Sequence, residues 1–102
     1  MNIQTAAAQL KATFKKVGHT TVVATEYSTT LFHYNTAIVT IDSTTLEINN
    51  GGYNTATTKK FINRALQAVG FNGYLSQRKF DLYLTVMGVE RPFIGSQVCL
   101  TA

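Results

Sequence analysis

The sequence predicts an α+β domain, because helical and strand-like patterns alternate along a short chain. Apolar residues recur at helical spacing near the N-terminus and again in the middle of the chain, and the other segments are short runs rich in threonine, valine and aromatic residues. With 102 residues, 45% of them hydrophobic, the chain is long enough for one core and too short for two domains of typical size. We therefore predict a single domain over residues 1–102: an N-terminal helix, a four-stranded antiparallel meander, a central amphipathic helix, and a C-terminal β-hairpin with room for an edge strand.

The first helix is predicted from an apolar stripe that begins at Ile3. Positions three and four apart stay apolar as far as Val17, whereas the lysines of this segment lie mostly off the stripe. Gly18 is expected to end the helix, because glycine readily adopts the left-handed conformation that closes a helix C-terminus.

Four strand-like runs follow, over residues 20–26, 29–34, 37–41 and 45–49. The segments between them are short and contain turn-forming residues such as Asn35 and Asp42. Connections of this length join neighbouring antiparallel strands, so the order of the strands in the sheet should follow their order in the chain.

The central helix is the clearest element of the sequence. Gly51 and Gly52 precede it in a turn where one glycine is expected to hold a positive φ. Thr55 or Thr57 supplies the N-cap, and Gly70 supplies the stop. The apolar stripe consists of Phe61, Ile62, Ala65, Leu66, Ala68 and Val69, and the polar side consists of Lys59, Lys60, Asn63, Arg64 and Gln67.

The C-terminal part predicts a hairpin and a further strand. Two strand-like runs, residues 74–77 and 80–86, are separated by Arg78 and Lys79, which form a charged tip. Residues 92–100 are apolar enough to add an edge strand, and Pro92 is tolerated at the start of such a strand.

Composition favours an anionic partner. The formal net charge is +4 and the sequence pI is near 9.4, an excess that attracts nucleic acid or an acidic protein surface. The single cysteine, Cys99, allows no intrachain disulfide, which suggests a reducing, intracellular environment. No apolar run approaches the roughly 20 residues of a membrane-spanning helix, so we expect a soluble protein with no membrane partner.

The expected binding surface lies around the start of the central helix. Lys59 and Lys60 fall in the first helical turn, where the helix dipole makes a lysine unfavourable by about 0.3–1 kcal/mol unless an anion offsets the repulsion. If the hairpin tip lies beside this end of the helix, a basic groove results, with Tyr53 and Tyr74 placed to stack on bases. The candidate nucleic-acid-binding or anion-binding residues are Tyr53, Thr55, Thr57, Thr58, Lys59, Lys60, Asn63, Arg64, Arg78 and Lys79. The alternative is structural: the glycines make a turn, the threonines cap the helix, and the lysines are solvated.

The sequence offers little for catalysis. Asp42 is better explained as a turn former, His33 as a half-exposed structural residue, and Cys99 as a buried thiol without an activating base. The order Thr57-Thr58-Lys59, with no glycine directly before it, does not match a phosphate-binding loop. We therefore predict no enzyme, no catalytic residues, no metal site and no cofactor.

Two motifs carry a resemblance to a known group. The run from Leu46 to Asn63 has a Gly-Gly-aromatic-x-Thr-x-Thr-Thr-Lys core, and the tripeptide Gln77-Arg78-Lys79 precedes an aromatic strand. Over residues 20–86 the chain resembles small proteins encoded by bacteriophages and related mobile elements, although Tyr53 and residues 81–84 replace the group's usual tryptophans. The resemblance implies a phage origin and hence the host cytoplasm, and it implies no particular activity.

The sequence as a whole predicts a non-catalytic phage accessory protein whose basic helix surface binds an anionic partner, nucleic acid first. Two alternatives stay open. The protein is then either an inhibitor that binds a host or defence protein, or an oligomeric structural part of the phage particle. Both alternatives place the contacts on threonine-rich sheet edges, and the second requires a homo-oligomer.

Overall fold

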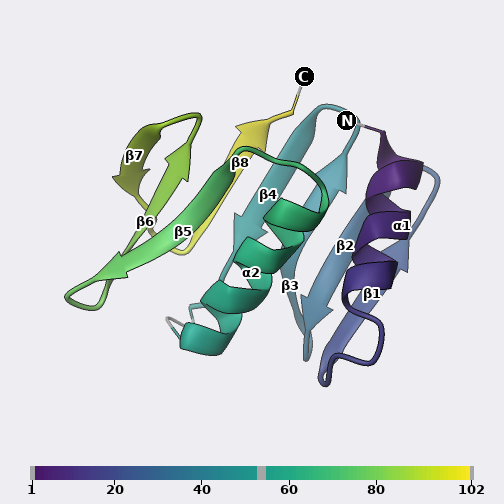
Figure 1. The fold of residues 1–102 in the computed structure, drawn as a ribbon, viewed down its shortest axis with the longest axis horizontal. Helices are drawn as coiled ribbons and strands as arrows, with labels where there is room; N and C mark the ends of the chain where they lie inside the picture. The colour runs from purple at the N-terminus through teal and green to yellow at the C-terminus, as the bar shows by residue number, and fades with distance from the viewer. Residues whose placement is uncertain (1, 53–54, 102) are drawn as a thin grey trace.

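The structure, a computed structural model, describes residues 2–52 and 55–101. These residues form two helices and eight strands arranged in two antiparallel sheets (Figure 1). In chain order the elements are α1 (Ile3–Thr13), β1 (Thr20–Ala24), β2 (Ser28–His33), β3 (Thr36–Asp42), β4 (Thr45–Asn49), α2 (Ala56–Ala68), β5 (Gly73–Arg78), β6 (Asp81–Val86), β7 (Val89–Pro92) and β8 (Ser96–Leu100). The predicted α+β class is confirmed, with its leading helix, meander, central helix and hairpin.

The larger sheet has the strand order β1-β2-β3-β4-β8, and the smaller sheet has the order β5-β6-β7. Both helices lie on the same face of the larger sheet, side by side and roughly antiparallel, as Figure 1 shows. The strand β5 packs against the side of α2 that faces away from α1. The two helices therefore form one layer above the meander.

The core fills the space between this helical layer and the sheet. Leu31, Val39 and Ile48 are paired across three neighbouring strands, and all three are fully buried. Side chains alternate along a strand, so the residues next to Leu31, Val39 and Ile48 in each strand generally point to the opposite face of the sheet, which neither helix covers. On the other side of the core, the helices and the C-cap residue of α1 bury Ala6, Ala7, Leu10, Phe14, Phe61, Ile62, Ala65 and Leu66.

A β-bulge changes the register near the β2–β3 turn. The pairing between β2 and β3 shifts after Leu31, so that Ile38 is inserted as an extra residue. Ile38 and Val39 are consecutive, yet both are buried. The bulge thus bends the start of β3, which lies with the β2–β3 turn beside the start of α2.

The first helix ends earlier than predicted. Its last residue is Thr13, with Phe14 as the C-cap, and the left-handed conformation falls on Lys16 at φ 63° instead of on Gly18. The apolar spacing misled the prediction because Phe14 and Val17 pack against the core from outside the helix.

The hairpin and the tail also differ from the prediction. Arg78 is the last residue of β5, so the tip consists of Lys79 and Phe80, both at positive φ (51° and 74°). The predicted edge strand over residues 92–100 is shorter: β8 begins at Ser96 and pairs with β4. The preceding strand, β7, was not predicted, and it extends the hairpin through its pairing with β6.

The turn before α2 should be sensitive to an added methyl group. Gly51 and Gly52 hold φ values of 63° and 81°, which confirms the expected role of this pair. We expect Gly52→Ala to lower the free energy of unfolding by about 1 kcal/mol, because alanine is strained at a positive φ. Gly18→Ala is the matched control, since Gly18 lies outside the left-handed region and an added Cβ meets no atom within 4 Å. Chemical denaturation of both variants checks this; equal losses would contradict it.

A buried hydroxyl in β2 should be dispensable. Thr29 is fully buried beneath the helices, and its Oγ1 has no hydrogen-bond partner among the described residues. We expect Thr29→Val to raise the free energy of unfolding by about 1 kcal/mol, because valine has the same shape without the unpaired polar atom. Thr30→Val, on the opposite face of the same strand, should change stability by less than about 0.5 kcal/mol. A rise in the melting temperature of both variants alike would refute the assignment to the buried hydroxyl.

Candidate functional site

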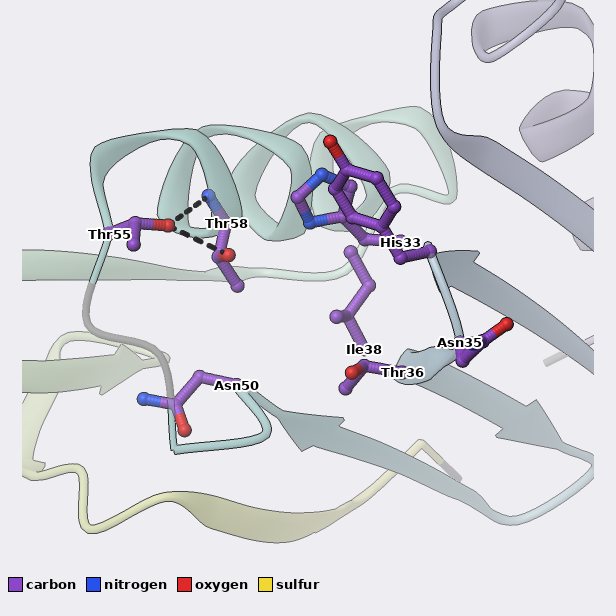
Figure 2. Close-up of a pocket in the computed structure, with 8 residues that line it drawn as sticks. His33, Asn35, Thr36, Ile38, Asn50, Thr55 and Thr58 are labelled. Atoms are coloured by element: carbon purple, nitrogen blue, oxygen red, sulfur yellow. Dashed lines mark hydrogen bonds between the residues drawn. The ribbon is translucent and has the colours of Figure 1, made fainter.

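The start of α2 is built by two threonines. Thr55 is the N-cap: its Oγ1 accepts a hydrogen bond from the backbone N–H of Thr58 at 3.2 Å and donates one to Thr58 Oγ1 at 2.9 Å (Figure 2). Thr58 is 4% exposed, so its hydroxyl faces the interior, whereas Thr57 is exposed. The three hydroxyls therefore do not converge on one surface point, and Thr58 is unavailable to a partner on the outside of the helix.

Two of the three charged residues of α2 lie at the surface, as the predicted binding surface requires. Lys60 and Arg64 are exposed, and Lys59 is half-buried. The Arg64 guanidinium carbon lies 5.7 Å from the centre of the Phe14 ring, which holds this cation over the junction between the two helices.

Asn63 has a structural role that the helical spacing did not predict. Its side-chain amide donates to the carbonyl of Leu75 at 2.9 Å, and its Oδ1 accepts from the N–H of Leu75 at 2.6 Å. These two bonds satisfy the backbone of β5 on the edge that faces α2, where there is no neighbouring strand. The Asn63 side chain is thereby committed to joining α2 to the smaller sheet.

Arg78 is likewise engaged within the smaller sheet. Its guanidinium donates to both carboxylate oxygens of Glu90, with Nη1 3.0 Å from Oε2, and it lies 4.1 Å from the centre of the Tyr83 ring. The hydrogen bond from Arg78 holds the pKa of the Glu90 carboxyl below its ordinary value. Only Lys79 keeps an exposed charge at the tip, which extends away from α1 (Figure 1). Of the stacking candidates, Tyr74 is exposed on β5, and Tyr53 lies outside the described residues.

The structure brings the N-terminal lysines, which the site prediction omitted, into the same layer. Phe14, just after α1, packs edge-on against Phe61 of α2 with ring centres 6.0 Å apart. This contact joins the last turn of α1 to the first half of α2, next to the exposed Lys11, Lys15 and Lys16. The sequence contains a signal for this layer, because no aspartate or glutamate occurs before Glu26 or between Glu47 and Asp81.

Charge is therefore segregated by layer. We name the basic helical layer after the six cations on or directly after the two helices, which are Lys11, Lys15, Lys16, Lys59, Lys60 and Arg64. These are six of the nine basic residues, and none of the five acidic residues lies in this layer. The acids occupy turns and strands: Glu26, Asp42, Glu47, Asp81 and Glu90.

A cavity of about 450 Å³ opens between the start of α2 and the bulged end of the sheet (Figure 2). Residues of the β2–β3 hairpin line one side, Asn50 lines the floor, and the two capping threonines line the other side. The lining residues are His33, Tyr34, Asn35, Thr36, Ile38, Asn50, Thr55 and Thr58. None of these described residues carries a permanent charge.

Three rings form a cluster at this cavity. His19 and Tyr34 are stacked, with ring centres 4.5 Å apart and an interplanar angle of 17°, and His33 lies 4.8 Å from Tyr34. His33 also packs edge-on against Phe61 at 5.1 Å. Both His19 and Tyr34 have left-handed backbones, with φ of 64° and 56°, and the Tyr34 N–H donates to the His19 carbonyl at 2.7 Å. Such conformations are costly for residues with a side chain. In this chain they also occur in turns at Lys16, Lys79, Phe80 and Met87.

The other groups considered for chemistry have structural surroundings. The Asp42 carboxylate accepts hydrogen bonds from the backbones of Thr44 and Thr45, which lower its pKa, so this side chain builds the β3–β4 turn. Partial burial raises the pKa of the Cys99 thiol and keeps it protonated at neutral pH. Within residues 2–52 and 55–101, no three histidine, cysteine or acidic side chains are grouped as metal ligands are.

Comparison with known proteins gives one match. The sequence model of the Kyanoviridae Gp96 protein matches residues 2–99. The chain belongs to this family. No curated protein and no solved structure matches the chain.

The Kyanoviridae Gp96 family consists of phage proteins, so the phage origin implied by the sequence is confirmed. The match also extends beyond the resemblance over residues 20–86, because it includes both α1 and most of β8. Neither helix of the described segments is long and apolar enough to cross a membrane.

Removal of the Asn63 amide should weaken the link between α2 and the smaller sheet. We expect Asn63→Ala to lower the free energy of unfolding by about 1–3 kcal/mol, because the N–H and the carbonyl of Leu75 lose their partner. Gln67→Ala is the control, since Gln67 is exposed one turn further along the helix. Urea denaturation measures both. A loss for Asn63→Ala no larger than for the control would mean that water replaces the amide at no cost.

Proposed function

We propose that this phage protein binds nucleic acid through the basic helical layer, without catalysing a reaction on it. The observation that carries the proposal is the segregation of charge: six cations and no acid lie on the helical side of the molecule. Clustered lysine and arginine side chains bind phosphates through release of counterions, whatever the base sequence. We place this activity in the host cytoplasm, where phage nucleic acid is expressed and replicated.

Among the described residues, the surface formed by the two helices offers more unpaired cations to a phosphate backbone than the predicted groove between α2 and the hairpin tip. Exposed cations from the end of α1 and from the first half of α2 lie on both sides of the Phe14–Phe61 contact. In contrast, Arg78 is neutralised by Glu90, and the hairpin tip extends away from this surface. The proposed interface therefore keeps Lys59, Lys60 and Arg64 and gains the three lysines of the N-terminal segment.

A non-catalytic role fits the state of the titratable groups. The Asp42 carboxylate is held in a turn, and the Cys99 thiol is protonated and has no adjacent base among the described residues. Binding alone is thus the simplest activity for these residues to supply.

A second candidate is supported by the uncovered face of the larger sheet. This face carries threonines and exposed apolar side chains, among them Val23, Val98 and Leu100, and no basic residue. Such a face favours self-association, as expected of a structural subunit of the phage particle. Light scattering on the purified protein tests it: a monomer at high protein concentration would refute this second candidate.

The nucleic-acid interface is tested with two matched variants. Lys15→Ala with Lys60→Ala removes two charges from the basic helical layer, and Lys79→Ala with Arg91→Ala removes two exposed charges from the smaller sheet. Both double variants lower the net charge equally. We expect the first to weaken binding to DNA or RNA and to reduce the slope of log affinity against log salt by about 0.7 per lost contact for single strands. The second should bind almost as the unmutated protein does.

Fluorescence anisotropy at several salt concentrations gives the measurement. Equal weakening by the two double variants would show that total charge, and not this surface, controls binding. The absence of any binding by the unmutated protein at low salt and tens of micromolar would refute the proposal, since several phosphate contacts are strong under those conditions.

A further inference from the structure

The cavity beside α2 has the chemistry of a nucleobase site. Its volume of about 450 Å³ lies within the ordinary range of small-molecule pockets. The lining consists of aromatic rings, hydroxyls, amides and one buried aliphatic residue, Ile38. Because no permanent charge lines it, the cavity suits a neutral, polar-edged group better than a phosphate.

Tyr34 presents an exposed aromatic ring at this cavity. Tyr34 is 62% exposed although it is a large aromatic residue, and the stacked His19 ring supports it. The His19 ring stacks on the Tyr34 ring with centres 4.5 Å apart, and the His33 ring lies 4.8 Å away, so both histidines hold the Tyr34 side chain before any ligand arrives. Proteins bind unpaired bases by stacking them on tyrosine and histidine rings of this kind.

Polar groups able to read the edge of a base lie deeper in the cavity. Thr58 Oγ1 accepts the proton of Thr55, and among the described residues nothing accepts the proton of Thr58 itself. The His33 ring nitrogens also have no hydrogen-bond partner within the described part of the chain. A buried hydroxyl donor and an unengaged imidazole therefore remain for the donors and acceptors of a ligand.

The cavity and the basic helical layer share neighbouring residues of α2. Thr58, which lines it, directly precedes Lys59 and Lys60 on α2. In a nucleic acid each base is attached to a sugar that lies between two phosphates, so a base and its phosphates are close together. A strand whose phosphates contact Lys59 or Lys60 would therefore place a neighbouring base at the Thr58 side of the cavity.

We infer that this cavity takes one unpaired nucleobase of a single-stranded nucleic acid whose phosphates contact the basic helical layer. The inference rests on the proposed function and makes it specific, because a paired base cannot enter the cavity. Single strands should accordingly bind more tightly than duplexes of the same length.

The test compares Tyr34→Ala, Tyr34→Phe and Tyr74→Ala. Tyr74 is the matched control, because it is 53% exposed and lies on β5, away from the cavity. The probes are a short mixed-sequence single strand and an abasic strand with the same number of phosphates. We expect Tyr34→Ala to weaken binding of the base-containing strand by about 5- to 150-fold with an unchanged salt slope, and to leave the abasic strand unaffected. Tyr34→Phe and Tyr74→Ala should bind both strands as the unmutated protein does.

A second measurement separates this inference from the proposed function. Neutral nucleosides carry no phosphate, so their binding does not depend on the basic helical layer. We expect them to shift the amide NMR signals of His33, Tyr34 and Thr58 in the unmutated protein, and not in Tyr34→Ala. If strands bind but nucleosides shift none of these signals, the base site is refuted and the phosphate interface remains. If nucleosides bind but no strand does, the interface is refuted and the cavity is retained.

Three further outcomes overturn the inference. Equal affinity for base-containing and abasic strands means that no base is bound. Equal weakening of both strands by Tyr34→Ala, together with a lowered melting temperature, means that Tyr34 is structural. Signal shifts caused by neutral oligosaccharides and not by nucleosides would assign the cavity to a sugar.

Discussion

The packing of Phe61 is the contact on which the arrangement of the molecule depends. This ring meets Phe14 edge-on at 6.0 Å and His33 edge-on at 5.1 Å, so one side chain of α2 touches both the end of α1 and the end of β2. Edge-to-face pairs add about 0.5–1.5 kcal/mol to the burial of their area. The first contact closes the helices into one layer, and the second places the aromatic cluster beside the start of α2. The positions of the candidate interface and of the cavity therefore both depend on the packing of Phe61.

Much of the fold follows from local patterns in the sequence. The strand β4 has its predicted bounds because Leu46 and Ile48 alternate with Glu47, and α2 ends near Gly70, whose φ is 74°. The hairpin tip was misplaced by one residue, because Lys79 and Phe80 hold positive φ values that usually require asparagine or glycine. The pairing of β8 with β4 could not be predicted either, because it joins segments far apart in the chain and leaves no periodic signal in the sequence.

The candidate site was predictable to a smaller degree. Local reasoning found the cations of α2, because a lysine at a helix N-terminus contradicts the helix dipole in the sequence itself. It could not show that Asn63 bonds to Leu75 or that Arg78 pairs with Glu90, because both contacts depend on how the smaller sheet packs. It also omitted Lys11, Lys15 and Lys16, although the long acid-free stretches of the chain mark the same layer. The positions of the acidic residues in the sequence thus predict the segregation of charge better than the positions of the basic residues do.

The strained turn at Tyr34 has a physical consequence for how binding energy is obtained. A left-handed backbone at a residue with a side chain costs on the order of 1–3 kcal/mol, and here both His19 and Tyr34 adopt it. The bulge at Ile38, the backbone hydrogen bond between the two strained residues and the contact of His33 with Phe61 hold that conformation in the folded protein. The stacking of the Tyr34 ring on the His19 ring holds the exposed side chain in the folded protein, so a ligand that contacts Tyr34 causes little additional loss of conformational entropy.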